Sequence, residues 1–425
     1  MVVANIISAI GNNSSVYPLI VRDCGIEVPT KIALTYNQNK NESKEIAYLA
    51  ARERFLDEYS TSAVWIGGIP FVGWLCDKII KSKGLNPNIN LKLFKEEEGI
   101  QGIDYNIKKF AKKAPEAVND LIKAKKNKKL YEKLLAGKFI ASTTIPILVM
   151  GFILPKLIFA SSAKKINEIR NKEIKNKSNQ INFTQKDRFY KKNDANISFN
   201  GSAWISKVAN FSAQDKMAVT DGGYSIGRVS TARNKNESYD LGFKMTGMMF
   251  LNFVAPKWIE KGLNKITGVE LDPIILSDKD FIQKIKDNSI KLPKTDSARD
   301  LLDFVDDITN QDTLFVKYAK KLNKIKMLEN NIRDPREYVN IKNLAKFRND
   351  IEDFMKKSGK SDNFTRFTRN AKIAKSVNIL TNVALSSFLL AYALPKVQFA
   401  FRKLITGSDL EPGLAPAEKL IDQNA

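Results

Sequence analysis

One pentapeptide in the sequence matches a catalytic motif. Gly223-Tyr224-Ser225-Ile226-Gly227 has the form G-x-S-x-G, which in α/β-hydrolases places a nucleophilic serine on a sharp strand-to-helix turn. Such a serine needs an imidazole to accept its proton, and the sequence contains no histidine. We therefore expect a glycine-rich structural turn at this position and no hydrolase chemistry.

Other residues that could do chemistry are few. The two cysteines are Cys24, beside a predicted turn, and Cys76, at the end of an apolar run, so we expect neither a redox pair nor a zinc site. Glu96-Glu97-Glu98 is a run of adjacent carboxylates, whereas calcium loops space their oxygen ligands along the chain. Neither a Walker loop nor a dinucleotide-binding glycine motif occurs. The sequence predicts no catalytic residue, metal site or cofactor, and a protein that is not an enzyme.

The chain is strongly basic, with 69 Lys and Arg against 46 Asp and Glu in 425 residues and a net charge of +23. A positive surface attracts anionic lipid, acidic proteins or nucleic acid. Residues 187–192 and 366–369 interleave aromatic and basic side chains, as surfaces that bind single strands do, but the membrane interface has the same mixture. Since no nucleic-acid-binding module is recognisable, membrane lipid is the favoured partner, a protein partner is possible and nucleic acid is less favoured. The oligomeric state is not predictable.

Two uncharged segments are long enough to cross a bilayer, which takes about 20 apolar residues in a helix. They are Phe139–Pro155, continued after one lysine to Ala163, and Ser376–Pro395, continued after one lysine to Phe401. The alternative is a helix buried on all sides in a soluble domain. Tyr59–Cys76 is also uncharged but contains three glycines and a proline, which suits either a span or a re-entrant hairpin. Met245–Pro256 is shorter and predicts an amphipathic helix on the membrane surface.

Basic residues flank these apolar segments. The membrane-interface candidates are Lys138, Lys156, Lys164, Lys165, Lys375, Lys396, Arg402 and Lys403. Lys156 and Lys396 each follow a proline, and their long side chains can extend to the headgroups. More basic residues precede Ser376–Pro395 than follow it, which favours residues 164–375 on the cytoplasmic side. The expected location is a bacterial inner membrane, and the alternative is the cytoplasm.

The chain also matches itself in collinear order. Asn39–Ser43 recurs as Asn234–Ser238, and Leu154-Pro155-Lys156 recurs as Leu394-Pro395-Lys396. The asparagine and glutamate of each pentapeptide suit a helix start, and an Asp and a Gly further upstream suit a turn. The positions predicted to be equivalent are Asp23 and Asp221, Gly25 and Gly223, Asn41 and Asn236, and Glu42 and Glu237.

These observations predict a mainly α fold made by tandem duplication of a unit of about 200 residues. The first repeat is 1–163, a charged linker is 164–199, and the second repeat is 200–425 with an insertion around 269–336. Each repeat has short extended segments near its start and ends in a long apolar helix.

The expected function is a membrane-associated scaffold or binding protein whose basic cytoplasmic surface contacts anionic lipid or an acidic partner. One alternative is a soluble, basic nucleic-acid-binding protein with buried apolar helices. The other is a small transporter or pore component built from two repeats, although the apolar runs contain no convincing charged pair.

Overall fold

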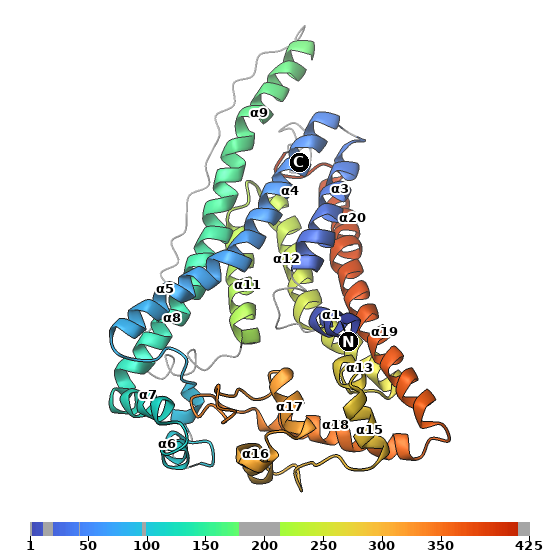
Figure 1. The fold of residues 1–425 in the computed structure, drawn as a ribbon. Coiled ribbons are helices and arrows are strands. Elements are labelled where there is room, and N and C mark those ends of the chain that lie inside the picture. The colour runs from blue at the N-terminus through green and yellow to red at the C-terminus, as the bar shows by residue number, and fades with distance from the viewer. Residues whose placement is uncertain (1, 12–19, 42, 96–98, 178–212, 415–425) are drawn as a thin grey trace. The chain divides into compact units, whose positions relative to one another are not determined.

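The computed structural model describes residues 2–11, 20–41, 43–95, 99–177 and 213–414 (Figure 1). It is mainly helical, as predicted, with 77% helix and no strands in these ranges. The only β-type pairing that they contain is an isolated bridge between Met327 and Arg333. The expectation of extended segments near the repeat starts is wrong for the described residues, because Ile20–Glu27 and Ala213–Ser230 are helical.

The chain forms two compact units. Unit 1 comprises residues 1–20, 72–139 and 252–386, and unit 2 comprises residues 21–71, 140–251 and 387–425. Each unit therefore takes segments from both predicted repeats. The first part of the predicted linker, residues 164–177, continues a helix, and residues 178–199 lie outside the described ranges.

Unit 1 is built from short helices around a large apolar core, and α6 (Ile103–Phe110) and α7 (Pro115–Lys126) contribute a smaller, separate cluster that includes Phe110 and Val118. Phe281, Leu301, Phe315 and Leu344 are fully buried in the large core, and most of the helices begin at a side chain that accepts a backbone N–H, such as Ser297. The predicted insertion around 269–336 lies in this unit. Its helices are α1 (Val2–Gly11), η3 (Leu91–Phe94), α6 (Ile103–Phe110), α7 (Pro115–Lys126), α13 (Ala255–Thr267), α14 (Pro273–Leu276), α15 (Lys279–Lys286), α16 (Ala298–Asp306), η5 (Ile308–Asn310), α17 (Leu314–Lys321) and α18 (Ile341–Gly359).

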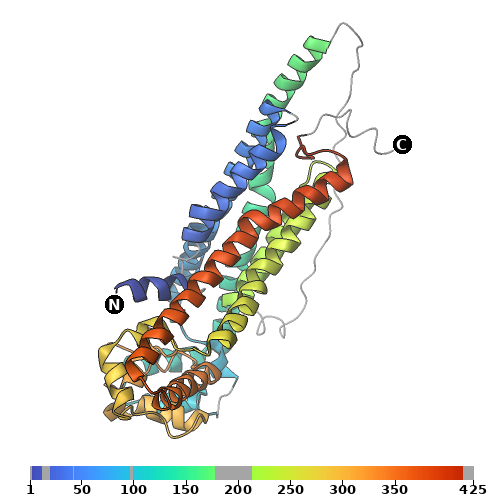
Figure 2. The same ribbon diagram turned by 90° about the vertical axis from the view of Figure 1, so that its right-hand side faces the viewer.

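Unit 2 contains two helical hairpins and the long helices packed against them. The helices that form the hairpins are η1 (Ile20–Glu27) with α3 (Val28–Asn39), α4 (Lys44–Ala63), α11 (Ala213–Ser230) and α12 (Lys235–Phe253). Ser43 caps α4 by accepting the N–H of Ile46, and Asn234 accepts the N–H of Glu237 at the start of α12. Figure 2 shows α12 lying beside α20 (Leu394–Thr406) along much of its length.

Among the described residues, three continuous helical tracts are long and apolar enough to cross a membrane: Lys44–Ser82, Lys128–Ala163 and Phe364–Thr406. This confirms that part of the prediction. The first comprises α4, η2 (Val64–Gly68) and α5 (Ile69–Ser82). The second comprises α8 (Lys128–Leu148), η4 (Val149–Ile153) and the first part of α9 (Leu154–Lys177). The third comprises α19 (Phe364–Phe388), η6 (Leu389–Ala393) and α20. Tyr59–Cys76 is thus part of an unbroken helix, and the re-entrant hairpin is not formed.

Each tract contains a π-helical turn immediately before a proline. The N–H of Ile69 bonds to the oxygen of Val64, that of Leu154 to Val149, and that of Leu394 to Leu389. The next residue in each case is a proline, whose ring would clash with the carbonyl four residues earlier in a regular helix. Since a π turn holds one more residue than an α turn, it gives the ring room, and each helix continues through its proline.

Candidate functional site

Unit 2 contains a network of buried ionic side chains. Ten of them are no more than 9% exposed: Glu27, Lys31, Glu53, Arg54, Asp57, Arg228, Glu237, Asp240, Lys244 and Arg402. An isolated buried charge is strongly unfavourable, so partners decide whether such a set is tolerated. Here the charges are paired across helices that are far apart in sequence.

Glu58 on α4 is the centre of the first cluster. Its carboxylate lies 2.9 Å from Nζ of Lys244, 3.3 Å from Nη1 of Arg54 and 3.7 Å from Nζ of Lys31. Lys31 is also paired with Glu27, one helical turn earlier on its own hairpin arm. Three cations from α3, α4 and α12 therefore share the Glu58 carboxylate.

Arg402 on α20 forms the second cluster. Its Nη2 lies 2.9 Å from Oδ2 of Asp240, and its Nη1 lies 3.0 Å from Oε2 of Glu411. Gln398, one turn earlier on α20, donates to the same Asp240 oxygen at 2.7 Å. Burial opposes ionisation of Glu411, but Arg402 and Arg54 together hold the pKa of its carboxyl below the usual value. The segment after α20 is thereby attached to the helix bundle by charge.

The third cluster joins α4 to the α11–α12 hairpin. Arg228 pairs with Asp57 at 2.7 Å, and Arg233 bridges Glu53 at 3.1 Å and Glu237 at 2.8 Å. Oδ1 of Asp57 and Nε of Arg228 are buried and have no hydrogen-bond partner among the described residues. Both residues line a cavity of about 30 Å³, which is room for ordered water that would satisfy these atoms.

The G-x-S-x-G segment lies inside helix α11, so the predicted turn is wrong. Gly223 and Gly227 are four residues apart and share one face of the helix. A Cβ on Gly227 would lie 2.9 Å from Cα of Gly151, and one on Gly223 would lie 2.4 Å from Cδ1 of Ile147. The two glycines thus permit close packing of α11 against the α8–η4 tract, as small residues do between membrane helices.

The membrane-interface candidates occupy different environments. Four of them are exposed: Lys156, Lys165, Lys396 and Lys403. Lys164 lies on α9, and its side chain is not among those that the structure describes. Lys138 pairs with Asp77.

Two of these candidates are buried. Lys375 donates to Oδ1 of Asn264 at 2.9 Å. Arg402 is fully buried in the second cluster, so its charge is neutralised inside unit 2.

Asp23 and Gly25 lie in η1, while Asp221 and Gly223 lie in α11, so the predicted Asp–Gly turns are wrong. The helix-forming residues around them override local turn preference. Asp23 pairs with Arg22 at 2.9 Å. Burial raises the pKa of Asp221 to about 7, and the negative charge of Asp23 adds to this effect.

The two matching pentapeptides both lie at helix starts but are displaced by one turn. Asn41 is in the turn before α4, and Glu42 lies outside the described residues. Asn236 and Glu237 lie in the first turn of α12. Asn39 and Asn234, the first residues of the two segments, both bind the chain after α20: Oδ1 of Asn39 accepts from the N–H of Glu411, and Nδ2 of Asn234 donates to the oxygen of Pro412.

The ionic network itself was not among the predicted sites. Glu27 with Lys31 and Arg54 with Glu58 are spaced four residues apart, which is a usable signal for neighbours on one helix face. Asp240 and Lys244 share this spacing, but Asp240 pairs with Arg402 and Lys244 pairs with Glu58, so the local signal gives the wrong partners.

The arrangement provides ion pairing, hydrogen bonding and small polar cavities. Within the described ranges, no three His, Cys, Asp or Glu residues are grouped so that they could hold a metal ion. No known protein family matches the sequence, and neither the curated proteins nor the solved structures include a significant match to it.

Proposed function

We propose that the chain is an integral membrane protein that acts as a scaffold or binding protein. The observation that carries this proposal is the outward direction of the apolar side chains in the three tracts. In the most apolar 18-residue stretch of each tract, the buried share is only 6% for Lys44–Ser82, 33% for Lys128–Ala163 and 33% for Phe364–Thr406. Exposed residues include Phe71, Trp74, Ile145, Leu148 and Phe388. Contiguous apolar surface of this kind is unfavourable in water and suits a lipid environment.

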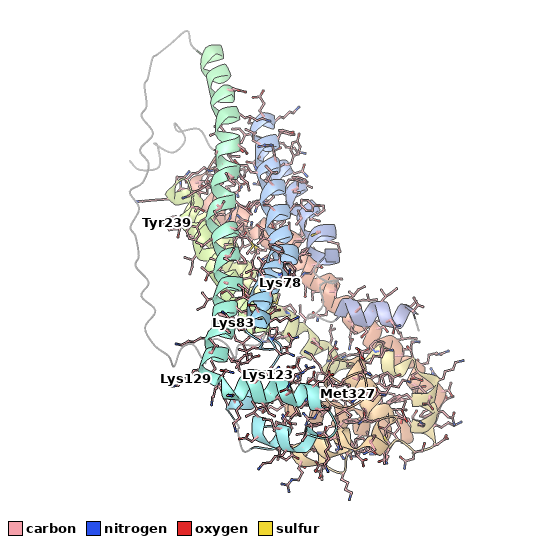
Figure 3. All side chains as sticks on the ribbon, turned by 60° about the vertical axis from the view of Figure 1, so that its left-hand side comes forward. Lys78, Lys83, Lys123, Lys129, Tyr239 and Met327 are labelled. Atoms are coloured by element: carbon pink, nitrogen blue, oxygen red, sulfur yellow. The ribbon has the colours of Figure 1, made fainter. Side chains whose placement is uncertain are left out.

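Basic side chains near the tracts support contact with anionic lipid. Exposed lysines occur at the end of α5, on α7 and at the start of α8, where Figure 3 labels Lys83, Lys123 and Lys129. Lys156 and Lys396 are exposed within the apolar tracts. Each cation close to an anionic membrane surface contributes about 1 kcal/mol. In this proposal residues 164–375 face the cytoplasm and the membrane is a bacterial inner membrane; an acidic protein is the other partner that such a surface would bind.

Reciprocal packing within unit 2 supports the proposed tandem duplication. α11 of the second half packs against η4 of the first half, and α3 of the first half packs against η6 of the second. Within the halves, α4 packs against α9, and Phe243 of α12 stacks on Phe401 of α20 at 4.6 Å. Two repeats related by a local twofold axis would have this exchange of equivalent contacts.

The buried ionic network favours a second candidate, a small transporter or pore component. Many transporters are built from repeats, and ionisable residues within membrane helices mark ligand and ion pathways. Arg54 and Glu58 directly precede the uncharged run at Tyr59–Cys76, and Arg402 directly follows the run that ends at Phe401. The charged pairs absent from the runs themselves are therefore present at their ends, within the same continuous helices.

Membrane fractionation of the full-length expressed protein tests the proposal. We expect the chain to stay with membranes after high-salt and carbonate washes and to be released only by detergent. Release by carbonate would contradict insertion and indicate surface attachment. A fully soluble product would contradict the proposal and favour the nucleic-acid-binding alternative, which filter binding to labelled RNA and DNA would then test.

A further inference from the structure

The chain that follows α20 is bound to unit 2 in the way that a protein binds a peptide. α20 ends at Gly407, whose left-handed conformation (φ 65°) stops the helix, and residues 408–414 are not helical (Figure 2). Leu410 and Leu414 are only 3% and 1% exposed. Both pack in an apolar cluster with Leu49 of α4. The segment therefore has two buried apolar anchors, four residues apart.

The two matching pentapeptides bind the backbone of this segment. Oδ1 of Asn39 accepts the N–H of Glu411 at 2.8 Å, and Nδ2 of Asn234 donates to the oxygen of Pro412 at 2.8 Å. The first asparagine of each pentapeptide thus binds one of two consecutive residues through its main chain. Main-chain hydrogen bonds combined with apolar anchors are typical of extended-peptide recognition. They give the repeated pentapeptide a role that a helix start alone does not explain.

Glu411 places a carboxylate between two arginines. Its Oε2 lies 3.0 Å from Nη1 of Arg402, and its Oε1 lies 3.7 Å from Nη2 of Arg54. Each arginine also pairs with a carboxylate of the helices, so Glu411 completes an ionic network that is already partly paired. A segment that took the place of residues 408–414 would need a carboxylate at the same point, because removing one partner from a buried ionic network is unfavourable.

The pairing of Glu411 with Arg402 is imperfect. Nη1 of Arg402 and Oε2 of Glu411 are buried, but neither has a hydrogen-bond partner among the described residues. The two groups therefore attract each other without the geometry of a hydrogen bond, which leaves a buried donor and a buried acceptor unsatisfied. A carboxylate that is not constrained by the short connection to α20 could form this hydrogen bond and so compete with Glu411.

Gly413 is a further point of selection. A Cβ at this position would lie 2.2 Å from Nε of Arg233. Arg233 cannot move aside freely, because Glu53 and Glu237 bind its guanidinium at 3.1 and 2.8 Å. The surface that binds the segment therefore favours a glycine two residues after the glutamate.

We propose that unit 2 has a peptide-binding surface, with Asn39 and Asn234 at its centre, and that residues 408–414 are its intramolecular ligand. An acidic segment of a partner protein replaces them. The partner segment has the pattern of Leu410 to Leu414, with a large apolar residue directly before a glutamate, a glycine two residues after it and a second apolar residue next to the glycine. This inference names the ligand of the binding protein proposed above and rests on that part of the proposal. Because the surface does not require membrane insertion, the fractionation experiment and the peptide-binding experiment fail independently.

Fluorescence anisotropy of a synthetic peptide tests the surface. The peptide has the sequence of residues 408–414, is blocked at both ends and carries fluorescein on a linker. The protein is the full chain in non-ionic detergent with Leu410→Asp and Leu414→Asp, which remove both anchors of its own segment; we call it the released variant. We expect saturable binding to the released variant and about tenfold or more weaker binding to wild type, because a tethered ligand competes at a high effective concentration. Absent binding, or equal binding to both proteins, would overturn the proposal.

Substitutions in the protein and in the peptide locate the contact. In the released variant, Asn39→Ala and Asn234→Ala should each weaken binding by about three- to tenfold, the effect of one lost hydrogen bond. Asn37→Ala, at an exposed asparagine of the same unit, is the matched control and should not. Glu411→Lys and Gly413→Ala in the peptide should also weaken binding, and a peptide of scrambled sequence that binds equally well would overturn the proposal.

Hydrogen exchange of the wild-type chain decides if the released variant does not fold. Excess unlabelled peptide should accelerate amide exchange in residues 408–414, above all at Glu411, and leave exchange in α18 of unit 1 unchanged. The reason is that a displaced segment loses the hydrogen bonds that protect its amides. Exchange that the peptide does not alter would overturn the proposal and make the segment a permanent part of the fold.

Discussion

Asp240 on α12 and Arg402 on α20 form a fully buried ion pair, with 2.9 Å between Oδ2 and Nη2, and they lie 162 positions apart in the sequence. Removing one partner leaves the other charge buried without compensation. We expect Arg402→Ala to reduce the free energy of unfolding by about 3–5 kcal/mol, measured by denaturant titration in detergent micelles.

The double variant Asp240→Leu/Arg402→Met is the control for this pair. Replacing a buried ion pair by apolar residues of similar volume is often neutral or stabilising. We expect the double variant to be clearly more stable than Arg402→Ala. Glu411 loses Arg402 in both variants, so a double variant as unstable as the single one would mean that the loss does not come from an unpaired Asp240.

Gly227 on α11 should not tolerate a side chain. A Cβ there would lie 2.8 Å from Cε2 of Phe152 and 2.9 Å from Cα of Gly151, so Gly227→Ala must separate the two helices. We expect a loss of about 1–3 kcal/mol in the free energy of unfolding. Gly242→Ala on α12, where nothing lies within 4 Å, should be neutral or stabilise by up to about 1 kcal/mol. Equal effects of the two substitutions would show that helix propensity dominates and close packing does not.

The acid stability of unit 1 should depend on Asp278. Burial alone would raise the pKa of its carboxyl, but hydrogen bonds from Tyr318, Lys317 and the N–H of Asp280 lower the pKa below its ordinary value of 3.8. A carboxylate with a lowered native pKa stabilises the fold above its unfolded pKa, and this contribution disappears as the pH falls through the native value. We expect Asp278→Asn to be less stable than wild type at pH 7 and the difference to shrink below about pH 4.

Thermal unfolding of the full chain between pH 7 and pH 2.5 measures the effect of Asp278. Asp280→Asn, in the same helical turn and exposed, is the matched control and should show a much smaller difference. A gap between Asp278→Asn and wild type that is constant with pH would argue against a role for the ionised carboxylate.

The exposed side chains at positions 156 and 396 test the topology. Cysteines placed there, in a variant that lacks Cys24 and Cys76, should react with a membrane-impermeant maleimide when both faces of the membrane are open. The reason is that a residue at the interface stays in contact with water. If both remain unreactive until detergent dissolves the membrane, Lys156 and Lys396 do not lie at a boundary.

Hydropathy and helix periodicity were sufficient to predict the helical class and to locate the three apolar tracts, because both signals are local. The turn predicted at Asp23 and Gly25 failed since the preferences of two residues are weaker than the packing of a long helix around them. The pentapeptide at Asn39–Ser43 was correctly assigned to a helix start, but the capping side chain belongs to Ser43 and not to Asn41.

The ionic network could not be predicted from one sequence. Its pairs join residues 171 and 186 positions apart, as in Arg228 with Asp57 and Lys244 with Glu58. The one acidic residue four positions from Lys244 is Asp240, but the ion-pair partner of Lys244 is Glu58, so spacing does not distinguish it from the surface lysines of a basic chain. Burial alone makes it unusual, and burial depends on how the helices of unit 2 assemble.

The π turn at Leu389–Ala393 has a consequence for the direction of side chains along its tract. An α-helix advances about 100° per residue, so one additional residue in a turn rotates everything beyond it by roughly that angle. Upstream, Phe388 is 52% exposed; downstream, Gln398 and Arg402 point into unit 2 toward Asp240. The turn thus sets the rotational phase of α20, and deletion of one residue from it would turn Gln398 and Arg402 together away from Asp240.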